Sequence, residues 1–355
     1  MAGRPTMRDV AARAGVSHQT VSRVVNGEPS VTEPVRQRVV AAMTALGYRP
    51  SAGGRAMARG RTEVVGLVVP HDPGFTFAND HLMRLIGGAE QEVAARGHGL
   101  LLSTREAAGD AASAYRRFDR RRLVDGLLVE GGAGLRALSG LLAQGYPTVV
   151  IGYAEDDLPM VHPDDEGGAY AVTQHLLALG HRRIGVVDGA AENRLAMAAR
   201  LRGVERAFAD ARLAPSAELT VRGDFTVESG YTAAGLLFDR PDPPTAVFAF
   251  NDGMALGVLR WLRERGRAVP GDVSVAGFDD TSAGALSEPP LTSVALQSVD
   301  LGRRAAQILL DLLDGKQPAE RRTVIPSRLM VRHSTAPPPP LPTTPVTGTP
   351  SSPPP

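Results

Sequence analysis

The sequence predicts a small all-α domain at the N-terminus, followed by an α/β core with two doubly wound parallel sheets. Two observations predict this fold class: capped helical repeats in residues 1–48, and a long alternation of apolar runs with helical segments after residue 61. The 355 residues are too many for one compact core. The chain has no cysteine, which excludes a disulfide scaffold, a thiol nucleophile and a Cys-ligated metal.

Positive charge is concentrated at the N-terminus. Residues 1–61 contain ten arginines, no lysine and three acidic residues, whereas the formal net charge of the whole chain is only +1. The remaining residues therefore carry a small excess of negative charge. A basic head on a mildly acidic body is typical of a protein that meets a polyanion with one end only.

The first two helices of the head are predicted by their caps. Thr6 and Asp9 match a T-x-x-D capping box before apolar residues at helical spacing, and Gly15 ends this helix after two turns. Ser17 can cap a second helix over residues 17–26, whose valines are spaced to point inward. The two short helices are joined by a tight Ala-Gly-Val turn.

A third helix completes the head. Thr32 is expected to cap it, Pro34 is tolerated in its first turn, and Gly47 ends it. Two short helices around a tight turn, with a third helix that closes the core, predict a helix-turn-helix over residues 1–48.

The exposed face of the second helix indicates what the head binds. It carries side chains that form hydrogen bonds and none that is acidic: His18, Gln19, Thr20, Ser22, Arg23 and Asn26. In the major groove of DNA, Gln can bond bidentately to adenine and Arg to guanine. Ser, Thr and Asn suit phosphate oxygens, and the helix N-terminus adds a partial positive charge there. We therefore expect sequence-specific binding of double-stranded DNA.

The same residues resemble a known family. The segments TMRDVAARAGVSHQTVSRVVNG and LGYRP are similar to the heads of the lac repressor (LacI/GalR) family of bacterial transcription regulators. The resemblance implies that His18, Gln19 and Arg23 read bases. It also implies that six further side chains contact phosphates: Thr6, Ser17, Thr20, Ser22, Asn26 and Thr32.

Residues 49–61 match the family's hinge, which becomes helical on DNA and inserts an apolar side chain into the central minor-groove step. Met57 stands at the position of that wedge, which would unstack the step and bend the duplex. Gly53 and Gly54 together cost a helix about 2 kcal/mol relative to alanine, so we expect the hinge to be disordered without DNA. A plain flexible linker is the alternative.

Residues 62–333 alternate strand and helix signals. Strands are predicted at residues 64–70, 99–103, 126–130, 148–152, 183–188, 245–251 and 273–279. Helices are predicted at residues 82–95, 167–179, 199–211, 228–238 and 254–265. This βαβ alternation predicts parallel sheets with ligands beyond the carboxyl ends of the strands. The length is about twice what one such sheet needs, which predicts two lobes with a cleft between them.

The core also resembles the family. The segments LGHRRIGVV, FAFNDGMALGVLRWLRERGRAVPGDVSVAGFDDT and PPLTSV are similar to its periplasmic-binding-protein-like core. We expect an N-lobe of about residues 62–163 and 296–325, and a C-lobe of about residues 164–295 and 326–333. Residues 334–355 are rich in Pro, Thr and Ser and are expected to form a disordered tail.

Candidate effector-binding residues follow the predicted strands. Asp72 and Phe75 lie in an expected loop after the first strand. By resemblance, five further side chains contact the effector in the cleft: Arg200, Phe225, Asn251, Asp279 and Gln297. A flat ring for an apolar C–H face, with Asp, Asn and Arg for paired hydroxyls, is typical of a sugar site. Gly152 stands where some sugar-responsive members have an acidic residue.

Other classes of function have weaker signals. Residues 132–137 satisfy G-x-G-x-x-A for an NAD-type dinucleotide, but no clear acidic strand end follows at the right distance. No G-x-S-x-G, H-E-x-x-H or P-loop motif occurs, so we expect no enzyme, no cofactor and no metal site. A periplasmic sugar-binding protein is opposed by the basic head and by the absence of a signal-peptide h-region. A purine or another metabolite acting as a co-repressor is the alternative effector.

These observations predict a repressor that works in the cytoplasm, at the nucleoid. No apolar run approaches the roughly 20 residues that cross a bilayer, so no membrane contact is expected. One head spans only half of a palindromic site, so we expect a homodimer on a pseudo-palindromic operator.

Overall fold

The computed structural model describes residues 5–25, 28–48, 61–106, 108–118, 123–131, 138–154, 157–189 and 194–339. The chain divides into two units, Met1–Val161 with Val299–Thr323 and His162–Ser298 with Val324–Pro355. Five predictions fall outside the described residues: the role of Asn26, the hinge at residues 49–60, the role of Met57 within it, the G-x-G-x-x-A segment 132–137, and the tail from residue 340.

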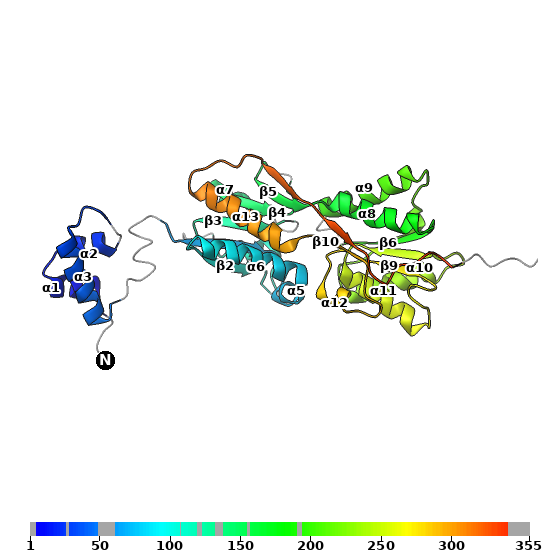
Figure 1. Ribbon diagram of the computed structural model, residues 1–355, viewed down its shortest axis with the longest axis horizontal. Coiled ribbons are helices and arrows are strands. Elements are labelled where there is room, and N and C mark those ends of the chain that lie inside the picture. Colours follow the sequence, from blue (N-terminus) through cyan, green and yellow to red (C-terminus); the bar gives the residue numbers. More distant parts are fainter. Residues whose placement is uncertain are drawn as a thin grey trace, which may run out of the picture. The chain divides into compact units, whose positions relative to one another are not determined.

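Three helices form the N-terminal head (Figure 1): α1 (Met7–Ala14), α2 (His18–Val25) and α3 (Glu33–Leu46). Val10, Val21 and Val39 are fully buried among them. Gly15 and Gly47 end α1 and α3 with φ of 65° and 62°, a left-handed conformation that residues with a Cβ rarely adopt.

The predicted caps are present at the first two helices of the head. Thr6 and Asp9 form the capping box of α1, with bonds in both directions. The Ser17 hydroxyl accepts a hydrogen bond from the Thr20 N–H at 3.1 Å, at the start of α2. Thr32 precedes α3, but its side chain makes no capping hydrogen bond, so the prediction of a Thr32 side-chain cap is wrong.

The first unit is built on a six-stranded sheet with the order β11-β5-β4-β3-β1-β2. Its strands are β1 (Val64–Val69), β2 (Gly99–Thr104), β3 (Gly126–Glu130), β4 (Thr148–Ile151), β5 (Met160–Pro163) and β11 (Arg322–Ile325). Its helices are α5 (Pro73–Ala78), α6 (Asp80–Ala95), the 3-10 helix η1 (Ala111–Ala114), α7 (Leu138–Ala143) and α13 (Ser298–Leu313). Strands β1 to β5 pair in parallel, as a doubly wound fold requires.

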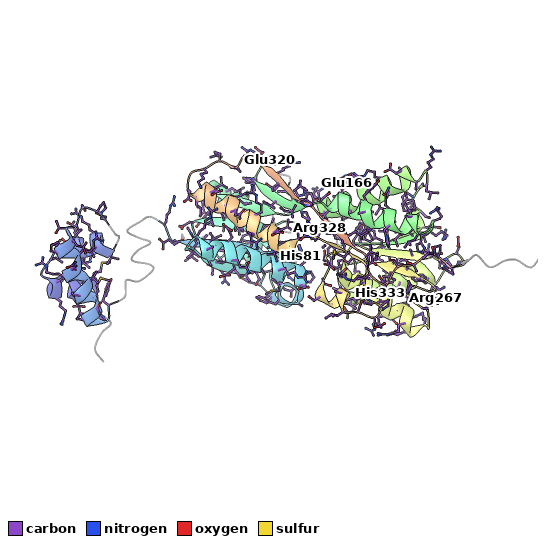
Figure 2. All side chains as sticks on the ribbon, viewed as in Figure 1. His81, Glu166, Arg267, Glu320, Arg328 and His333 are labelled. Carbon is purple, nitrogen blue, oxygen red and sulfur yellow. The ribbon has the colours of Figure 1, made fainter. Side chains whose placement is uncertain are left out.

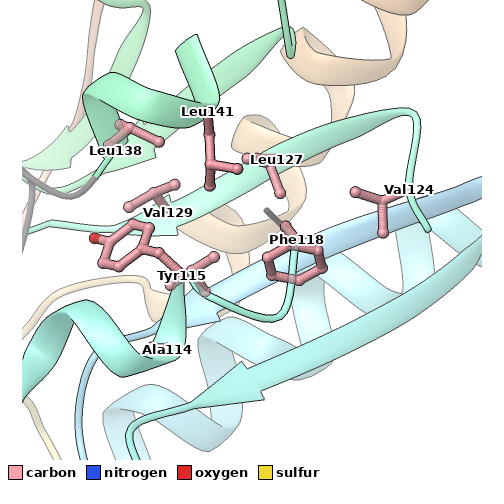
Figure 3. Packing of buried hydrophobic residues seen from close by; sticks show 9 residues of the cluster. Ala114, Tyr115, Phe118, Val124, Leu127, Val129, Leu138 and Leu141 are labelled. Carbon is pink, nitrogen blue, oxygen red and sulfur yellow. The ribbon is translucent and has the colours of Figure 1, made fainter. Parts of the chain in front are cut away.

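The apolar runs of this sheet form the core of the first unit. Leu127 of β3 packs with Tyr115 and Phe118, which follow η1 (Figure 3). Helices α6 and α13 approach each other backbone to backbone at Gly88 and Gly302. A Cβ at either glycine would overlap a carbonyl oxygen of the other helix.

The second unit contains a four-stranded parallel sheet with the order β7-β6-β8-β9. Its strands are β6 (Ile184–Asp188), β7 (Thr220–Arg222), β8 (Ala246–Ala249) and β9 (Ser274–Ala276). Its helices are α8 (Asp165–Ala178), α9 (Arg194–Asp210), η4 (Ala217–Leu219), α10 (Val227–Phe238), α11 (Asp252–Glu264) and α12 (Ser282–Ala285). A Cβ at Gly230 or Gly257 would overlap the backbone of the facing helix, so these glycines allow α10 and α11 to pack closely.

Charged side chains cover the outer faces of these helices. Glu166 of α8, labelled in Figure 2, is 3.1 Å from Arg202 and 2.6 Å from Arg206 of α9. Exposed pairs of this kind contribute about 0–1 kcal/mol each. The helices are therefore held mainly by their buried faces.

The folded region continues past residue 333. Strands β10 (Ser293–Ala295) and β12 (Arg328–Met330) pair antiparallel, and the chain then runs to Ser334, which is fully buried. The Ser334 hydroxyl donates to the Val275 carbonyl, and the Ala336 N–H donates to Ser274 Oγ at 2.9 Å. Residues 334–336, which the sequence assigned to a disordered tail, are therefore packed on the second unit.

The two parallel sheets confirm the predicted doubly wound arrangement, and the predicted strands overlap the observed ones. One local expectation is wrong: the residues after β1 form helix α5 rather than a loop. The Asp72 carboxylate caps this helix by accepting from the Phe75 N–H at 3.0 Å. None of the described helices is long and apolar enough to cross a membrane.

Candidate functional site

The predicted base-reading residues lie on the surface of the head. His18, Gln19 and Arg23 are exposed on α2, and Ser22 is half-buried, whereas valines on the opposite side of the helix are buried. The first turn of α2 contains no acidic residue. This face can therefore approach a polyanion without charge repulsion from the helix itself.

A carboxylate reaches this face from the segment after α2. Arg23 Nε lies 3.7 Å from Glu28 Oε2, and the two side chains are 55% and 47% exposed. Such an exposed pair is worth about 0–1 kcal/mol. Breaking the pair with Glu28, so that Arg23 can contact a base edge, therefore costs little free energy.

The hydroxyls predicted to contact phosphates also order helix ends. Thr6 Oγ1 donates to Asp9 Oδ2 at 2.8 Å, so the Thr6 hydroxyl proton is already bonded. Ser17 Oγ and Thr20 Oγ1 lie 2.9 Å apart at the start of α2. Thr32 is exposed immediately before α3. Each of these residues lies next to a helix N-terminus, where backbone N–H groups favour phosphate oxygens.

In the first unit, polar and aromatic side chains gather where β1, β2 and β3 end. His71 and Asp72 follow β1, Arg105 follows β2, and Glu130 is the last residue of β3. Asp72 Oδ2 lies 3.1 Å from Arg105 Nη2, and His71 Nε2 lies 3.2 Å from Glu130 Oε2. The rings of His71 and Phe75 are 5.0 Å apart and tilted. These five residues are called the first-unit cluster below.

The charges of this cluster influence one another. Burial disfavours the charged form of His71, but the attraction of Glu130 outweighs it and raises the pKa of His71. The bond from the Phe75 N–H, with the nearby Arg105, lowers the pKa of Asp72. Both shifts favour the charged form, which pairs His71 with Glu130 and Asp72 with Arg105.

In the second unit, Arg200 of α9 is buried and bonded on two sides. Its Nε donates to Asp165 Oδ1 at 2.7 Å, and its Nη1 donates to the backbone carbonyl of Phe250. Its guanidinium lies 3.8 Å from the centroid of the Phe278 ring. Asp165 is 1% exposed, so the two buried charges compensate each other. An effector that contacts Arg200 would therefore meet a guanidinium that these bonds already hold in place.

Asn251 joins two neighbouring segments of the second unit. Its Oδ1 accepts from the Met254 N–H at 2.8 Å and caps α11. Its Nδ2 donates to the Phe225 carbonyl at 2.9 Å. The backbone of one predicted effector residue is thus held by the side chain of another.

Asp252, the first residue of α11, is completely buried. Its Oδ2 accepts from the Thr281 N–H and hydroxyl, and its Oδ1 accepts from the Ser293 hydroxyl at 2.6 Å. Burial raises the pKa of Asp252 to about 6, although these hydrogen bonds oppose the rise. The carboxylate ties α11 to the segment that follows Asp279.

Three predicted effector residues have an unusual backbone conformation. Phe225, Asp279 and Gln297 have φ of 69°, 102° and 54° and follow β7, β9 and β10. Non-glycine residues rarely adopt positive φ, and such positions concentrate at functional sites. Arg200, Phe225 and Asn251 are linked through residues 250 and 251, and Arg200 stacks on the residue before Asp279.

Comparison with known proteins places these features in a family. The model for bacterial regulatory proteins of the lacI family matches residues 6–51, and the model for a periplasmic binding protein-like domain matches residues 173–335. The HTH-type transcriptional regulator CelR of Thermobifida fusca is 36% identical over 339 residues, which are 93% of this chain and 98% of CelR. The chain belongs to the LacI family.

Solved structures of LacI-family proteins are similar over nearly the whole chain. A CelR–cellobiose complex has a TM-score of 0.72 at 36% identity and covers 93% of this chain and 100% of its own. A lac repressor dimer bound to operator and the anti-inducer ONPF has a TM-score of 0.82 at 27% identity, with 94% and 100% covered. This LacI-family member is a transcriptional regulator and not an enzyme. Its predicted fold class is confirmed.

Several polar residues at helix starts and strand ends of this LacI-family regulator were not predicted from the sequence. Asp165 and Asp252 are acidic residues in the first turns of α8 and α11, a position that carries no functional signature, and Glu130 is the last residue of β3. The position of Glu130 at a strand end was the available signal. The described residues contain no group of three His, Asp or Glu side chains that could hold a metal ion.

Proposed function

We propose that this regulator binds a pseudo-palindromic operator as a homodimer, represses transcription there, and is controlled by a small sugar effector. The observation that carries the proposal is the exposed face of α2, on a head whose first two helices are capped and whose buried valines form a common core. The regulator would act on chromosomal DNA, in the cytoplasm.

The roles of the head residues follow from their chemistry and their place. His18, Gln19 and Arg23 would contact base edges in the major groove. Thr6, Ser17, Thr20, Ser22, Asn26 and Thr32 would contact phosphates and set the orientation. Met57 would enter the minor groove from the hinge. Because one head covers a half-site, two heads related by a twofold axis match a pseudo-palindrome. The lac repressor structure with operator, which is similar over 94% of this chain, is a dimer.

The sugar assignment rests on the residues at the strand ends. Asn251 and Asp279 would bond neighbouring hydroxyls, Arg200 would add a donor, and Phe225 would cover an apolar face. Asp72, Phe75 and Gln297 would complete the effector contacts. The positive φ of Phe225, Asp279 and Gln297 supports a functional role for these positions. The similar CelR structure is a complex with cellobiose.

The effector would control DNA binding by shifting a conformational equilibrium. It can shift that equilibrium only by its differential affinity for the two states, about 1–3 kcal/mol in typical cases. A change in the α/β core would then determine whether both hinges can fold on the operator.

Replacement of Arg23 tests the head. The full chain is used to select a cognate duplex from a random pool, and affinities for that duplex and for unrelated DNA are compared. Arg23→Ala should weaken cognate binding by about 1–3 kcal/mol and leave unrelated DNA nearly unchanged. Arg38→Ala, which removes the same charge from exposed surface of α3, is the matched control. Equal losses on both kinds of DNA would reduce Arg23 to a phosphate contact.

A further inference from the structure

Of the three acidic residues in the head, Glu28 is the one that pairs with a predicted base reader. The Asp9 carboxylate forms the capping box of α1, and Glu33 lies beside Arg36 of α3. Glu28 Oε2 instead lies 3.7 Å from Nε of Arg23, which is exposed on α2. A carboxylate on a surface that meets a polyanion weakens the attraction between them, so Glu28 opposes DNA binding unless it has a second effect.

The backbone of Glu28 is held between α2 and α3. Its N–H donates to the Arg23 carbonyl at 3.0 Å, at the carboxyl end of α2, and its carbonyl accepts from Arg36 Nη2 of α3 at 2.8 Å. The Ser30 hydroxyl donates to Glu28 Oε2 at 3.4 Å. These bonds keep the carboxylate within reach of the Arg23 side chain.

The pair joins Glu28 to Nε of Arg23, the guanidinium nitrogen next to the side-chain stem. The two terminal nitrogens, Nη1 and Nη2, carry four further N–H donors. A bidentate bond to guanine O6 and N7 needs two N–H groups side by side, which the terminal nitrogens can supply. The pair costs little free energy to break, but contact with a guanine does not require it to break.

The carboxylate affects a guanine edge and a phosphate differently. A guanine edge presents neutral acceptors, whereas a phosphate carries a full negative charge that Glu28 repels. A guanidinium that already has a carboxylate beside it also releases fewer counterions when it contacts a phosphate. The pair therefore weakens a phosphate contact of Arg23 more than it weakens a guanine contact.

We propose that Glu28 is a specificity-determining residue, which positions Arg23 for guanine and keeps it from serving as a general phosphate contact. The inference rests on the proposed function, because it deepens the role of one residue of the DNA-binding face. Glu28 acts through Arg23 and needs no base contact of its own.

Affinities of the full chain for its selected duplex and for an unrelated duplex of the same length test the proposal. Glu28→Gln removes the charge and keeps the shape of the side chain. Binding to unrelated DNA should tighten by about 3–10-fold, because the repulsion of phosphates is lost. Cognate binding should change by less than about 2-fold, because the loss of positioning offsets the loss of repulsion. An unchanged ratio of the two affinities would overturn the proposal.

Glu33→Gln is the matched control, because it removes the same charge from the same head. Glu33 is 67% exposed and lies 3.8 Å from Arg36, which is not a predicted base reader. Weaker repulsion should tighten cognate and unrelated DNA by similar factors and keep their ratio within about 2-fold of the wild type. If Glu33→Gln lowers the ratio as much as Glu28→Gln does, the effect is general electrostatics and the proposal is wrong.

A double-mutant cycle shows whether Glu28 acts through Arg23. In the Arg23→Ala background there is no guanidinium to position, so Glu28→Gln should leave the ratio of affinities unchanged. The Arg38→Ala background keeps Arg23 and should show the full effect of Glu28→Gln. A change of the same size in both backgrounds would mean that Glu28 acts independently of Arg23, which contradicts the proposal.

Two readouts distinguish positioning from a purely structural role. For unrelated DNA, the slope of log affinity against log salt concentration should steepen by about 0.9 in Glu28→Gln, because Arg23 then adds one phosphate contact. Duplexes selected by Glu28→Gln should lose part of the preference for guanine at one position of each half-site and keep the preferences elsewhere. A slope and a selected sequence identical to those of the wild type would exclude the positioning role.

The experiments separate this inference from the proposed function. A wild-type chain that prefers one duplex, by a ratio that Glu28→Gln does not change, overturns the role of Glu28 and leaves the DNA-binding role intact. A wild-type chain that prefers no duplex contradicts both.

Discussion

The polar side chains at the carboxyl ends of the two core sheets differ in whether they have hydrogen-bond partners. In the second unit, these side chains are bonded to one another: Arg200 to Asp165, and Asn251 to the backbone on both sides. In the first unit, the Tyr115 hydroxyl and Glu130 Oε2 lack a hydrogen bond from the described residues.

The difference teaches which polar groups are held rigidly within each unit. Side chains that are already bonded keep their geometry, so the second unit can present fixed donors and acceptors. Polar atoms without a hydrogen bond add less to the stability of the folded protein than bonded ones. We therefore expect a substitution that removes a bonded side chain of the second-unit edge to cost more stability than one at the first-unit edge.

The largest expected effect is that of Arg200→Ala on stability. Removal of one partner leaves the Asp165 carboxylate buried and uncompensated, which should lower the free energy of unfolding by about 3–5 kcal/mol. Urea titration followed by circular dichroism measures the change. Arg202→Ala, on the same helix but exposed, should cost less than about 1 kcal/mol. Similar losses of unfolding free energy in the two variants would show that the buried pair contributes no more to stability than the exposed one.

The pH dependence of stability should reveal Asp252. Its folded pKa of about 6 lies above the ordinary value of 3.8, so the folded state binds a proton more tightly than the unfolded state. The contribution of Asp252 to stability therefore rises as the pH falls through 6 toward 4, by up to about 3 kcal/mol.

Comparison with Asp252→Asn isolates this contribution from other titrating groups. Free energies of unfolding are measured for both proteins by urea titration between pH 8 and pH 4. The wild-type value minus the variant value should increase as the pH falls, because only the wild type carries the titrating carboxyl group. A difference that stays constant over this range would contradict the raised pKa.

The smallest expected effect is that of Asp72 on stability. Asp72→Ala removes the cap of α5 and the ion pair with Arg105, which should cost about 1 kcal/mol in urea unfolding. Asp72→Asn keeps an oxygen that can accept from the Phe75 N–H, so it should stay within about 0.5 kcal/mol of the wild type. If Asp72→Ala lowers the free energy of unfolding as much as Arg200→Ala does, the expected difference in stability cost between the two sheet edges is contradicted.

The head could be predicted almost completely from the sequence, because its determinants are local. The capping box of Thr6 and Asp9 spans three residues, and the left-handed conformation of Gly15 needs no distant partner. Thr32 is the exception: its type and position suit a cap, but its side chain makes no capping bond. Seven strands of the core were predictable for a related reason, since strands buried on both faces form continuous apolar runs, whereas β5, β7, β10, β11 and β12 were not predicted.

The interactions of the site residues could not be predicted in the same way. Arg200 bonds to Asp165, 35 residues earlier, and the partners of Asp252 lie 29 and 41 residues later. Helix α5 was not predicted for a similar reason, because an Asp side chain such as Asp72 can accept a backbone hydrogen bond in a loop as well as at the start of a helix. Residue type and spacing identify a polar group at a strand end, but they do not identify its partner.

The sequence by itself determined the helices of the head, the seven core strands with continuous apolar runs, and the residue types that follow them. These features depend on side-chain periodicity and on bonds between near neighbours in the chain. Only the tertiary structure decided which of the polar groups have hydrogen-bond partners and which do not. That outcome depends on burial and on long-range pairing, since a carboxylate or hydroxyl has the same local signature whether or not a distant segment supplies its hydrogen bond.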